Sequence, residues 1–234
     1  MAKYRRVLLK LSGEALSAGS DGIYNHAFLG EVADTVRKLS EEGVQIAIMV
    51  GAGNIWRGRQ GVDMDRGTAD SMGMLATCIN ALMLKDSFER AGLTACVLTS
   101  VSMPQFAEQY TSYGAKAHLD AGHIVVFGGG IGLPYFSTDT AAAMRAAEIG
   151  ADVMLMAKNI DGIYTDDPRI NPNAKKLDTV SCRDILKDGL KAIDSTAAAL
   201  CMDAKIPVLV FGLDTPKNIL RAARGETIGT VITC

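Results

Sequence analysis

The sequence lacks the features that direct a protein to a membrane, to secretion or to bulk binding of nucleic acid. Its N-terminal apolar stretch covers only residues 7–11, too short for a signal peptide, and no stretch reaches the length that spans a bilayer. Its formal net charge is -2, from 24 basic and 26 acidic residues spread along the chain. We therefore expect no membrane and no nucleic acid among its partners, because bulk charge favours neither.

The chain also has few cysteines, and their spacing forms no recognisable pattern. There are five, an odd number, and none belongs to a Cys-x-x-Cys pair, which argues against a disulfide framework and against a zinc site. We expect five reduced thiols in a cytoplasmic protein, and no metal held by protein ligands. The cysteines are Cys78, Cys96, Cys182, Cys201 and Cys234.

Apolar runs and helical patterns alternate along the 234 residues, 48% of which are hydrophobic. Short runs rich in Val, Ile and Leu predict buried strands at residues 6–11, 44–50, 93–98, 123–127, 152–156, 207–211 and 228–232. Amphipathic or Ala-rich stretches predict helices at residues 31–42, 69–90, 138–150, 196–205 and 216–224. This alternation indicates an α/β fold, a three-layer α/β/α sandwich with a mainly parallel sheet, and we expect one domain over residues 1–234.

Two stretches depart from the pattern. Residues 159–181 are rich in Asn and Asp, contain Pro168 and Pro172, and show no helical period, which favours a functional segment. Residues 72–84 are apolar on nearly all sides, more than a single core-facing stripe requires. That helix is either deeply buried or a contact between subunits.

Glycine-containing loops follow three of the predicted strands, at residues 10–14, 51–54 and 128–132. Glycine lets the backbone approach phosphoryl oxygens, and the carboxyl ends of parallel strands meet at one edge of a sheet. Any one of these loops alone is better interpreted as an ordinary turn than as a phosphate-binding loop, but three together favour phosphate binding. None matches a Walker A or a Gly-x-Gly-x-x-Gly pattern, so the common nucleotide folds are disfavoured.

Lys10, Arg57 and Lys158 lie at or just beyond predicted strand ends, where three cations can converge on phosphate groups. Asp139 begins a predicted helix, as many acidic residues do, but a carboxylate between two lysines would hold both ammonium groups. For Asp194 we favour a helix cap. These residues alone predict a phosphate-handling α/β enzyme.

Five motifs, in order along essentially the whole chain, resemble the bacterial uridylate kinases of the amino-acid-kinase superfamily. They are KLSGEAL at 10–16, GAGN at 51–54 before Arg57, DSMGMLAT at 70–77, PYFSTD at 134–139 and DGIYTDDP at 161–168. The resemblance implies transfer of the γ-phosphoryl group of ATP to UMP, giving UDP and ADP in pyrimidine nucleotide biosynthesis, with Mg²⁺ accompanying ATP. It places UMP towards the N-terminal part and ATP towards the C-terminal part.

The resemblance also implies a role for each matching position. The catalytic residues would be Lys10, Arg57, Asp139 and Lys158. ATP would be bound by Lys10, Leu11, Ser12, Gly13, Gly53, Arg57, Lys158, Asn159, Tyr164 and Asp167. UMP would be bound by Ala52, Asp70, Ile131, Gly132, Leu133, Pro134, Tyr135, Phe136, Ser137 and Thr138.

Two positions depart from the commoner family pattern. Ala52 stands where many members have a third glycine, and Ile131 and Leu133 stand in a segment that more often reads Gly-Thr-Gly-Asn-Pro. Because Ile131 and Leu133 cannot hydrogen-bond through their side chains, any reading of uracil there must use backbone groups.

The family resemblance further implies a homohexamer built from dimers, with GTP and UTP as effectors, and residues 72–84 are our candidate for a dimer contact. Two other functions stay open. An amino-acid kinase acting on a carboxylate or carbamate such as acetylglutamate would share the glycine loops and lysines. Its acceptor, however, has no ribose for Asp70 to bind. A non-catalytic nucleotide sensor needs no transition-state cations, so Lys10, Arg57 and Lys158 disfavour it.

Overall fold

The computed structural model describes residues 2–56, 63–166, 168, 170–190 and 193–234. One sheet of nine strands runs through it, in the order β4-β3-β5-β2-β1-β6-β10-β11-β9, and a separate hairpin pairs β7 with β8. The strands are β1 (Arg6–Leu11), β2 (Gln45–Val50), β3 (Ala95–Thr99), β4 (Glu108–Gln109), β5 (Ile124–Gly128), β6 (Val153–Lys158), β7 (Ile163–Tyr164), β8 (Lys176–Leu177), β9 (Thr179–Ser181), β10 (Val208–Gly212) and β11 (Thr230–Thr233).

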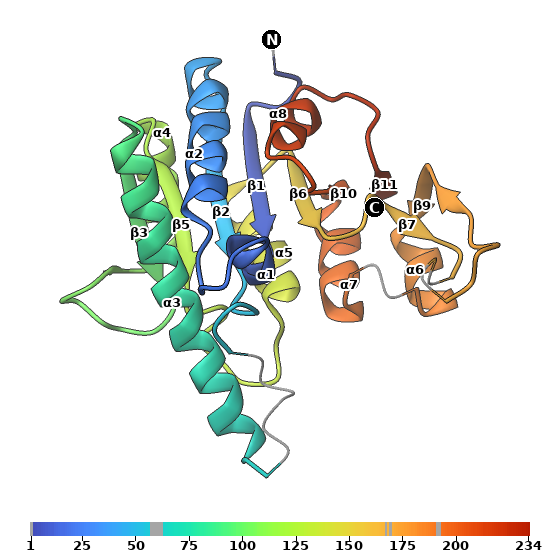
Figure 1. The fold of residues 1–234 in the computed structure, drawn as a ribbon, viewed down its shortest axis with the longest axis horizontal. Helices are drawn as coiled ribbons and strands as arrows, with labels where there is room; N and C mark the ends of the chain where they lie inside the picture. Colours follow the sequence, from blue (N-terminus) through green and yellow to red (C-terminus); the bar gives the residue numbers. More distant parts are fainter. Residues whose placement is uncertain (1, 57–62, 167, 169, 191–192) are drawn as a thin grey trace.

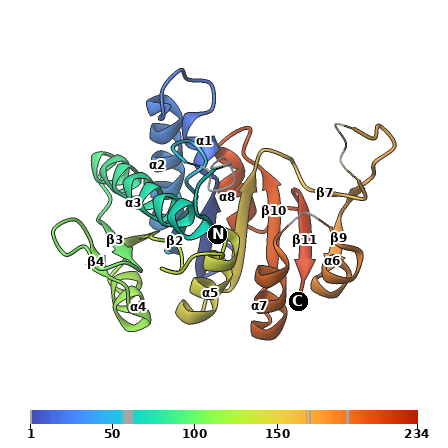
Figure 2. The same cartoon turned by 90° about the horizontal axis from the view of Figure 1, so that it is seen from below.

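Helices cover both faces of this sheet (Figures 1 and 2). They are α1 (Gly13–Ser17), α2 (His26–Glu41), α3 (Arg66–Arg90), α4 (Ser112–Asp120), α5 (Thr138–Ile149), α6 (Cys182–Asp188), α7 (Ser195–Ala204) and α8 (Lys217–Ala223). Helices α2, α3 and α8 pack on one face, and α4, α5, α6 and α7 pack on the other. The expected three-layer α/β/α sandwich with a mainly parallel sheet is confirmed; β11 runs antiparallel to β10.

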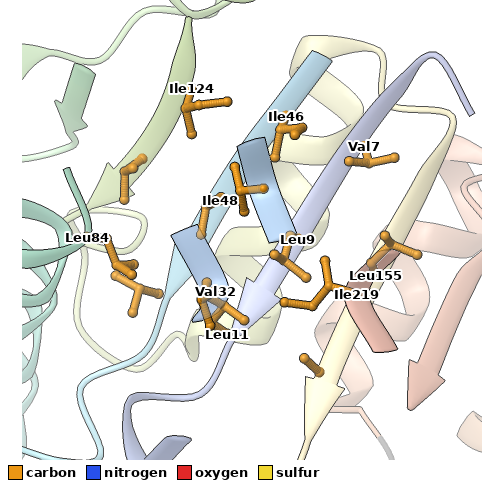
Figure 3. Close-up of a cluster of buried hydrophobic side chains, with 14 of the residues drawn as sticks. Val7, Leu9, Leu11, Val32, Ile46, Ile48, Leu84, Ile124, Leu155 and Ile219 are labelled. Atoms are coloured by element: carbon orange, nitrogen blue, oxygen red, sulfur yellow. The ribbon is translucent and has the colours of Figure 1, made fainter. Parts of the chain in front are cut away.

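Side chains alternate along β1, so successive residues of this strand lie on opposite faces of the sheet. Val7, Leu9 and Leu11 join the core beneath α2, α3 and α8 (Figure 3). Leu8 joins the core beneath α5 and α7. Since side chains alternate along a strand, Lys10 lies on the same side as Leu8 and so faces α5.

All seven predicted strands are present, within one or two residues at most ends. Two helices begin earlier than the apolar pattern predicts, because polar side chains cap them upstream. The Asn25 side chain accepts from the Phe28 amide, so α2 starts at His26, and the Asp65 carboxylate accepts from the Thr68 amide, so α3 starts at Arg66.

Residues 159–181 contain the β7–β8 hairpin and all of β9, so parts of this segment form short strands where we expected no regular structure. The Ser-Gly turn expected at residues 12–13 is instead the beginning of the short helix α1, capped by Ser12. The periodic signal was too short in both places to reveal the element.

The expectation of five reduced cysteines is wrong for two of them. Cys182 and Cys234 form a disulfide, whereas Cys78, Cys96 and Cys201 are free thiols. The two bonded cysteines are 52 positions apart, and they meet because β9 and β11 pair in register up to Ser181 and Thr233, the residues just before them. Spacing along the sequence could not show this pairing.

Within the described ranges, no helix is long and apolar enough to cross a membrane.

Candidate functional site

The carboxyl ends of β1, β2 and β6 meet beside α1 and the start of α5 (Figure 1). Lys10 lies near the end of β1, the residues 51–54 loop follows β2, and Lys158 ends β6. Parallel pairing of the three strands therefore brings together segments that are far apart in sequence, as the strand-end argument requires.

A carboxylate lies between the two lysines at this edge. Asp139 Oδ1 is 2.8 Å from Lys10 Nζ, and Asp139 Oδ2 is 3.6 Å from Lys158 Nζ. The side chains of Lys10, Asp139 and Lys158 are only 10%, 16% and 22% exposed. The cluster is therefore a set of charges with little water around it, where electrostatic interactions act more strongly than at the surface.

The surroundings shift the ionisation of this cluster in physically distinct ways. Burial alone would raise the pKa of Asp139, but the positive charges of Lys10 and Lys158 outweigh burial, and its pKa lies below the ordinary value. Burial lowers the pKa of Lys158; the Asp139 carboxylate opposes this effect and the charge of Lys10 adds to it. Asp139 thus stays ionised and helps to keep Lys158 charged.

The first two glycine loops are packed against each other. A Cβ atom on Gly13 would lie 2.5 Å from the Gly53 amide nitrogen and 2.7 Å from the Gly51 carbonyl oxygen, so only glycine fits there. Asn80 of α3, which is fully buried, donates to the Gly51 carbonyl at 2.7 Å. The backbone of both loops is thereby held close to the lysine cluster.

The larger of two cavities at this edge, about 480 Å³, opens over the lysine cluster. Among its described lining residues the one carboxylate is that of Glu14, which accepts from the Asn159 side chain at 2.9 Å. Two cations, Lys10 and Lys158, and the backbone of the glycine loops supply polar groups to a wall that is otherwise largely apolar, and these polar groups suit a polyanionic ligand. The lining residues are Lys10, Ser12, Gly13, Glu14, Gly51, Ala52, Gly53, Thr138, Lys158, Asn159, Ile160 and Pro168.

The smaller cavity, about 150 Å³, has apolar and polar groups on its walls in similar proportion. One wall is a single face of α3, and the opposite wall is the chain between β5 and α5. Trp56 lies at its edge, with its indole N–H donating to the Ala69 carbonyl at 2.9 Å. The lining residues are Ala52, Trp56, Ala69, Asp70, Gly73, Met74, Thr77, Gly130, Ile131, Leu133, Phe136, Ser137 and Thr138.

Ala52 and Thr138 line both cavities. The two cavities therefore adjoin. One has two lysines and the glycine-loop backbone on its wall, and the other has apolar side chains beside Asp70 and several hydroxyl groups. An arrangement of this kind can bind two molecules with one phosphate group of each near the contact point.

Asp70 tethers the loop of the smaller cavity to α3. Its Oδ2 accepts from the Tyr135 amide at 2.8 Å and from Arg66 Nε at 2.8 Å. Tyr135 has a φ of 72°, a left-handed conformation that is uncommon for a residue other than glycine. The Asp70 carboxylate thus satisfies the backbone of a strained residue in the same loop that closes the cavity.

The predicted site residues divide into three groups. Most line one of the two cavities. Leu11 has a fully buried side chain, Tyr164 donates its hydroxyl to Asp161 at 2.8 Å, and Gly132, Pro134 and Tyr135 lie in the loop without lining the described cavity. Arg57 and Asp167 lie outside the described residues.

Sequence reasoning missed several lining residues, above all Trp56 and the face of α3. Gly73, Met74 and Thr77 follow Asp70 by three, four and seven positions, so once Asp70 is placed in a site, these positions on the same helix face could have been added. Trp56 lies in the sequence between the glycine loop at residues 51–54 and Arg57, and this position could have indicated that it belongs to the site.

Asp194 caps α7 as expected, accepting from the Ala197 amide at 2.9 Å. It also accepts from Thr140 Oγ1 at 2.8 Å and from the hydroxyl of Ser137, the cap of α5. Asp194 therefore joins the first turns of two helices beside the lysine cluster.

Comparison with known proteins places the chain among kinases. A model of the amino acid kinase family matches residues 5–212. A UMP kinase from Bacillus anthracis is 36% identical with a TM-score of 0.94, covering 98% of this chain and 96% of that one. A UMP kinase from Ureaplasma parvum is 33% identical with a TM-score of 0.92, covering 99% and 100%. A uridylate kinase from Archaeoglobus fulgidus is 28% identical with a TM-score of 0.76, covering 100% of each chain.

The family match covers far more than half of the chain, and the solved structures share its fold over nearly their full lengths. The chain belongs to the amino acid kinase family.

Proposed function

We propose that this protein is a UMP kinase, which transfers the γ-phosphoryl group of ATP to UMP and releases UDP and ADP. The observation that carries the proposal is the pair of adjoining cavities, with the Lys10–Asp139–Lys158 cluster on the larger one. The full-length likeness to solved UMP kinases supports the choice of acceptor.

The larger cavity is the proposed ATP site. Lys10 and Lys158 neutralise charge on the transferring group, and the amides of Gly13 and Gly53 approach its oxygens. The other described residues of the proposed ATP site are Leu11, Ser12, Asn159 and Tyr164. The proposed ATP site also includes Arg57 and Asp167, because they match the family motifs. Asp139 acts on the lysines, holding both ammonium groups in place.

The smaller cavity is the proposed UMP site. The apolar side chains on its walls suit a nucleobase, and Asp70 is the proposed partner of the ribose hydroxyls. Ala52 and Thr138 lie where the phosphate of UMP would meet ATP. Ile131, Leu133, Phe136 and Ser137 enclose the nucleotide from the opposite wall, with Gly132, Pro134 and Tyr135 in the same loop.

The reaction needs little acid–base chemistry. An oxygen of the UMP phosphate is already ionised near neutral pH, so it attacks the γ-phosphorus without a general base. The UMP phosphate oxygen forms a bond to the γ-phosphorus. The bond between the γ-phosphorus and the β–γ bridging oxygen breaks, and the bridging oxygen leaves as part of ADP. Catalysis therefore depends on positioning the two substrates and on cations near the transferring group, and the lysines and glycine-loop amides of the site can supply both.

Mg²⁺ is the proposed cofactor, entering with ATP. Magnesium in phosphoryl-transfer sites is held by substrate phosphates, waters and only one or two carboxylates. Among the described lining residues of the larger cavity, Glu14 is the one carboxylate, so the donor set fits an ion held mainly by the nucleotide. Bound there, Mg²⁺ would neutralise charge on the transferring phosphate.

The proposal is tested by ADP release from Mg-ATP with UMP, CMP, dUMP, AMP, GMP and N-acetylglutamate as acceptors. We expect release with UMP. Release with the amino-acid derivative alone would keep the fold and replace the acceptor, and silence with all six would favour a nucleotide sensor.

The remaining expectations rest on the family resemblance. We propose a homohexamer whose dimer contact is α3, where Met72, Leu75, Ile79 and Leu82 form an exposed apolar stripe. GTP and UTP are the proposed effectors, and the proposed setting is pyrimidine nucleotide biosynthesis in the cytoplasm. Each is checked separately, by molecular mass in solution and by rates with added GTP or UTP.

A further inference from the structure

The loop that closes the smaller cavity has little means of holding its own shape. Gly129, Gly130 and Gly132 have φ values of 76°, 56° and 88°, in the left-handed region that glycine adopts readily. A glycine-rich backbone has no side chains with which to anchor itself. Its position beside a bound nucleotide must therefore be set by groups on neighbouring elements.

One anchor comes from α3. Thr77 Oγ1 accepts from the Gly129 amide at 2.8 Å and donates to the Met74 carbonyl at 2.7 Å. Thr77 itself lines the smaller cavity, so this contact belongs to the site already described.

The second anchor comes from the far side of the loop. Ser100, just after β3, donates its hydroxyl to the Gly130 carbonyl at 2.8 Å. A Cβ atom on Gly132 would lie only 3.2 Å from Ser100 Cβ, so the loop is packed against this serine as well as bonded to it.

Behind Ser100 lies a buried arginine that the proposed chemistry does not use. The Arg145 side chain, on α5, is 5% exposed, and it donates from NH2 to Ser100 Oγ at 2.9 Å. Its NH1 donates to Glu148, and its guanidinium lies 3.7 Å from the centre of the Tyr110 ring. A buried charge is costly unless its partners satisfy it, and these three contacts do so.

The direction of the hydrogen bonds links Arg145 to the loop. A guanidinium can only donate, so Ser100 Oγ accepts from Arg145 and its single hydrogen points to the Gly130 carbonyl. Arg145 therefore fixes which way the Ser100 hydroxyl points. Arginine suits this position because its planar fork reaches Ser100 and Glu148 while stacking on Tyr110, and an ammonium group has no such shape.

We propose that Arg145 is a positioning residue that acts through Ser100 to fix the residue 130–133 wall of the acceptor cavity and thereby sets the affinity for the acceptor nucleotide. Arg145 does not line the described cavity, so it touches no substrate there. The inference rests on the proposed function, because the acceptor is taken to be UMP.

The chain offers a readout of binding that does not depend on turnover. Trp56 is its one tryptophan and lines the acceptor cavity, so UMP can be titrated by tryptophan fluorescence without ATP. If the fluorescence of the wild-type protein does not change when UMP is added, the proposed acceptor is overturned. If the wild-type fluorescence does change and the variants bind UMP with the wild-type affinity, this inference alone is overturned.

We expect Ser100→Ala and Arg145→Lys each to weaken UMP binding about three- to tenfold, the loss of one hydrogen bond, while the KM for ATP stays at the wild-type value. Ser87→Ala is the matched control. It also removes a buried serine hydroxyl, which donates to the Met83 carbonyl at 2.9 Å, but it lies away from both cavities.

The double variant separates positioning from general damage. If Arg145 acts through Ser100, Arg145→Lys should have little further effect on UMP affinity once Ser100 is alanine. Independent, additive losses in the double variant would overturn the proposal. So would an equal rise in the KM for ATP, since that would indicate a loss of overall packing.

Discussion

Lys10, Asp139 and Lys158 form a small group of buried charges whose arrangement follows from three separate local causes. Lys10 faces α5 by strand alternation, Lys158 ends β6, and Asp139 lies in the first turn of α5 because Ser137 caps that helix. Acidic residues are favoured in a first helical turn, so the same feature that starts α5 also supplies the carboxylate.

Replacing Lys10 with alanine should lower kcat for UMP phosphorylation by about 100- to 1,000-fold, because a preorganised cation at the transferring group is lost. The fold should persist, with an unchanged circular dichroism spectrum. Lys85→Ala is the matched control, since Lys85 forms an ion pair with Glu89, one turn further along α3. Near-normal kcat in Lys10→Ala would remove Lys10 from the transfer step.

The pH profile of kcat should depend on Asp139. Burial lowers the pKa of Lys158, so this lysine loses its proton, and kcat should fall, at lower pH than for an ordinary lysine. Asp139→Asn removes the negative charge that favours the ammonium form. The alkaline limb of the variant should therefore move to lower pH, and a limb at the same or higher pH would contradict the assigned coupling.

Asp70→Asn should mainly raise the KM for UMP, by about tenfold, because a carboxylate accepts ribose hydroxyls better than an amide does. The Tyr135 amide can still donate to the remaining side-chain oxygen, so the loop should keep its anchor. Initial rates at varied UMP and fixed ATP give the measurement. A rise in the KM for ATP instead would place Asp70 outside the acceptor site.

Among the elements, α3 contributes most to the site, and it does so along one face, since Asn80 follows Thr77 by three positions. Ala69, Asp70 and Thr77 line the acceptor cavity, while Asn80 donates to the Gly51 carbonyl and to Asn54 Oδ1, both at 2.7 Å. The helix therefore places one wall of the cavity and fixes the loop after β2.

Asn80→Ala should lower the free energy of unfolding by about 1–3 kcal/mol, because the buried Gly51 carbonyl and Asn54 side chain lose a donor. Urea unfolding followed by circular dichroism measures the change. Ser87→Ala, about two turns further along α3, should cost less, since the Ser87 hydroxyl donates to the Met83 carbonyl of the same helix. Equal costs would mean that Asn80 holds no long-range contact.

The strands and the cation cluster could be predicted from the sequence, because buried parallel strands are continuous apolar runs and charged residues stand out at their ends. The short elements could not. Helix α4 contains Gly114 and only a few apolar positions, and α6 is seven residues long. Their positions depend on packing against the sheet, which local periodicity does not record.

Site residues followed the same division. Lys10 and Lys158 can be predicted because a charge at the end of a buried strand needs an explanation, and Asp139 because it begins the predicted helix at residues 138–150. Trp56 and Ser100 were not found, because they act through a cavity wall and a loop that exist only after β3, β5 and α3 have packed together.

At the scale of the whole molecule, α3 presents its apolar stripe outward from one end of the sheet. Leu75 and Ile79 are 53% and 51% exposed, and they lie on the same helix as the acceptor-cavity residues Asp70 and Thr77. A contact between two copies through this stripe would therefore lie directly behind the acceptor site.

The double change Leu75→Lys and Ile79→Lys should reduce the assembly to a smaller species, because four like charges would face one another in a symmetric contact and the apolar area would stay in water. Light scattering after size-exclusion chromatography gives the mass. Met202→Lys on α7, also an exposed apolar residue but in the opposite helix layer, should leave the mass unchanged. If the double variant keeps the wild-type mass, α3 is not the dimer contact; if Met202→Lys alone lowers it, the subunits meet through the layer of α7 instead.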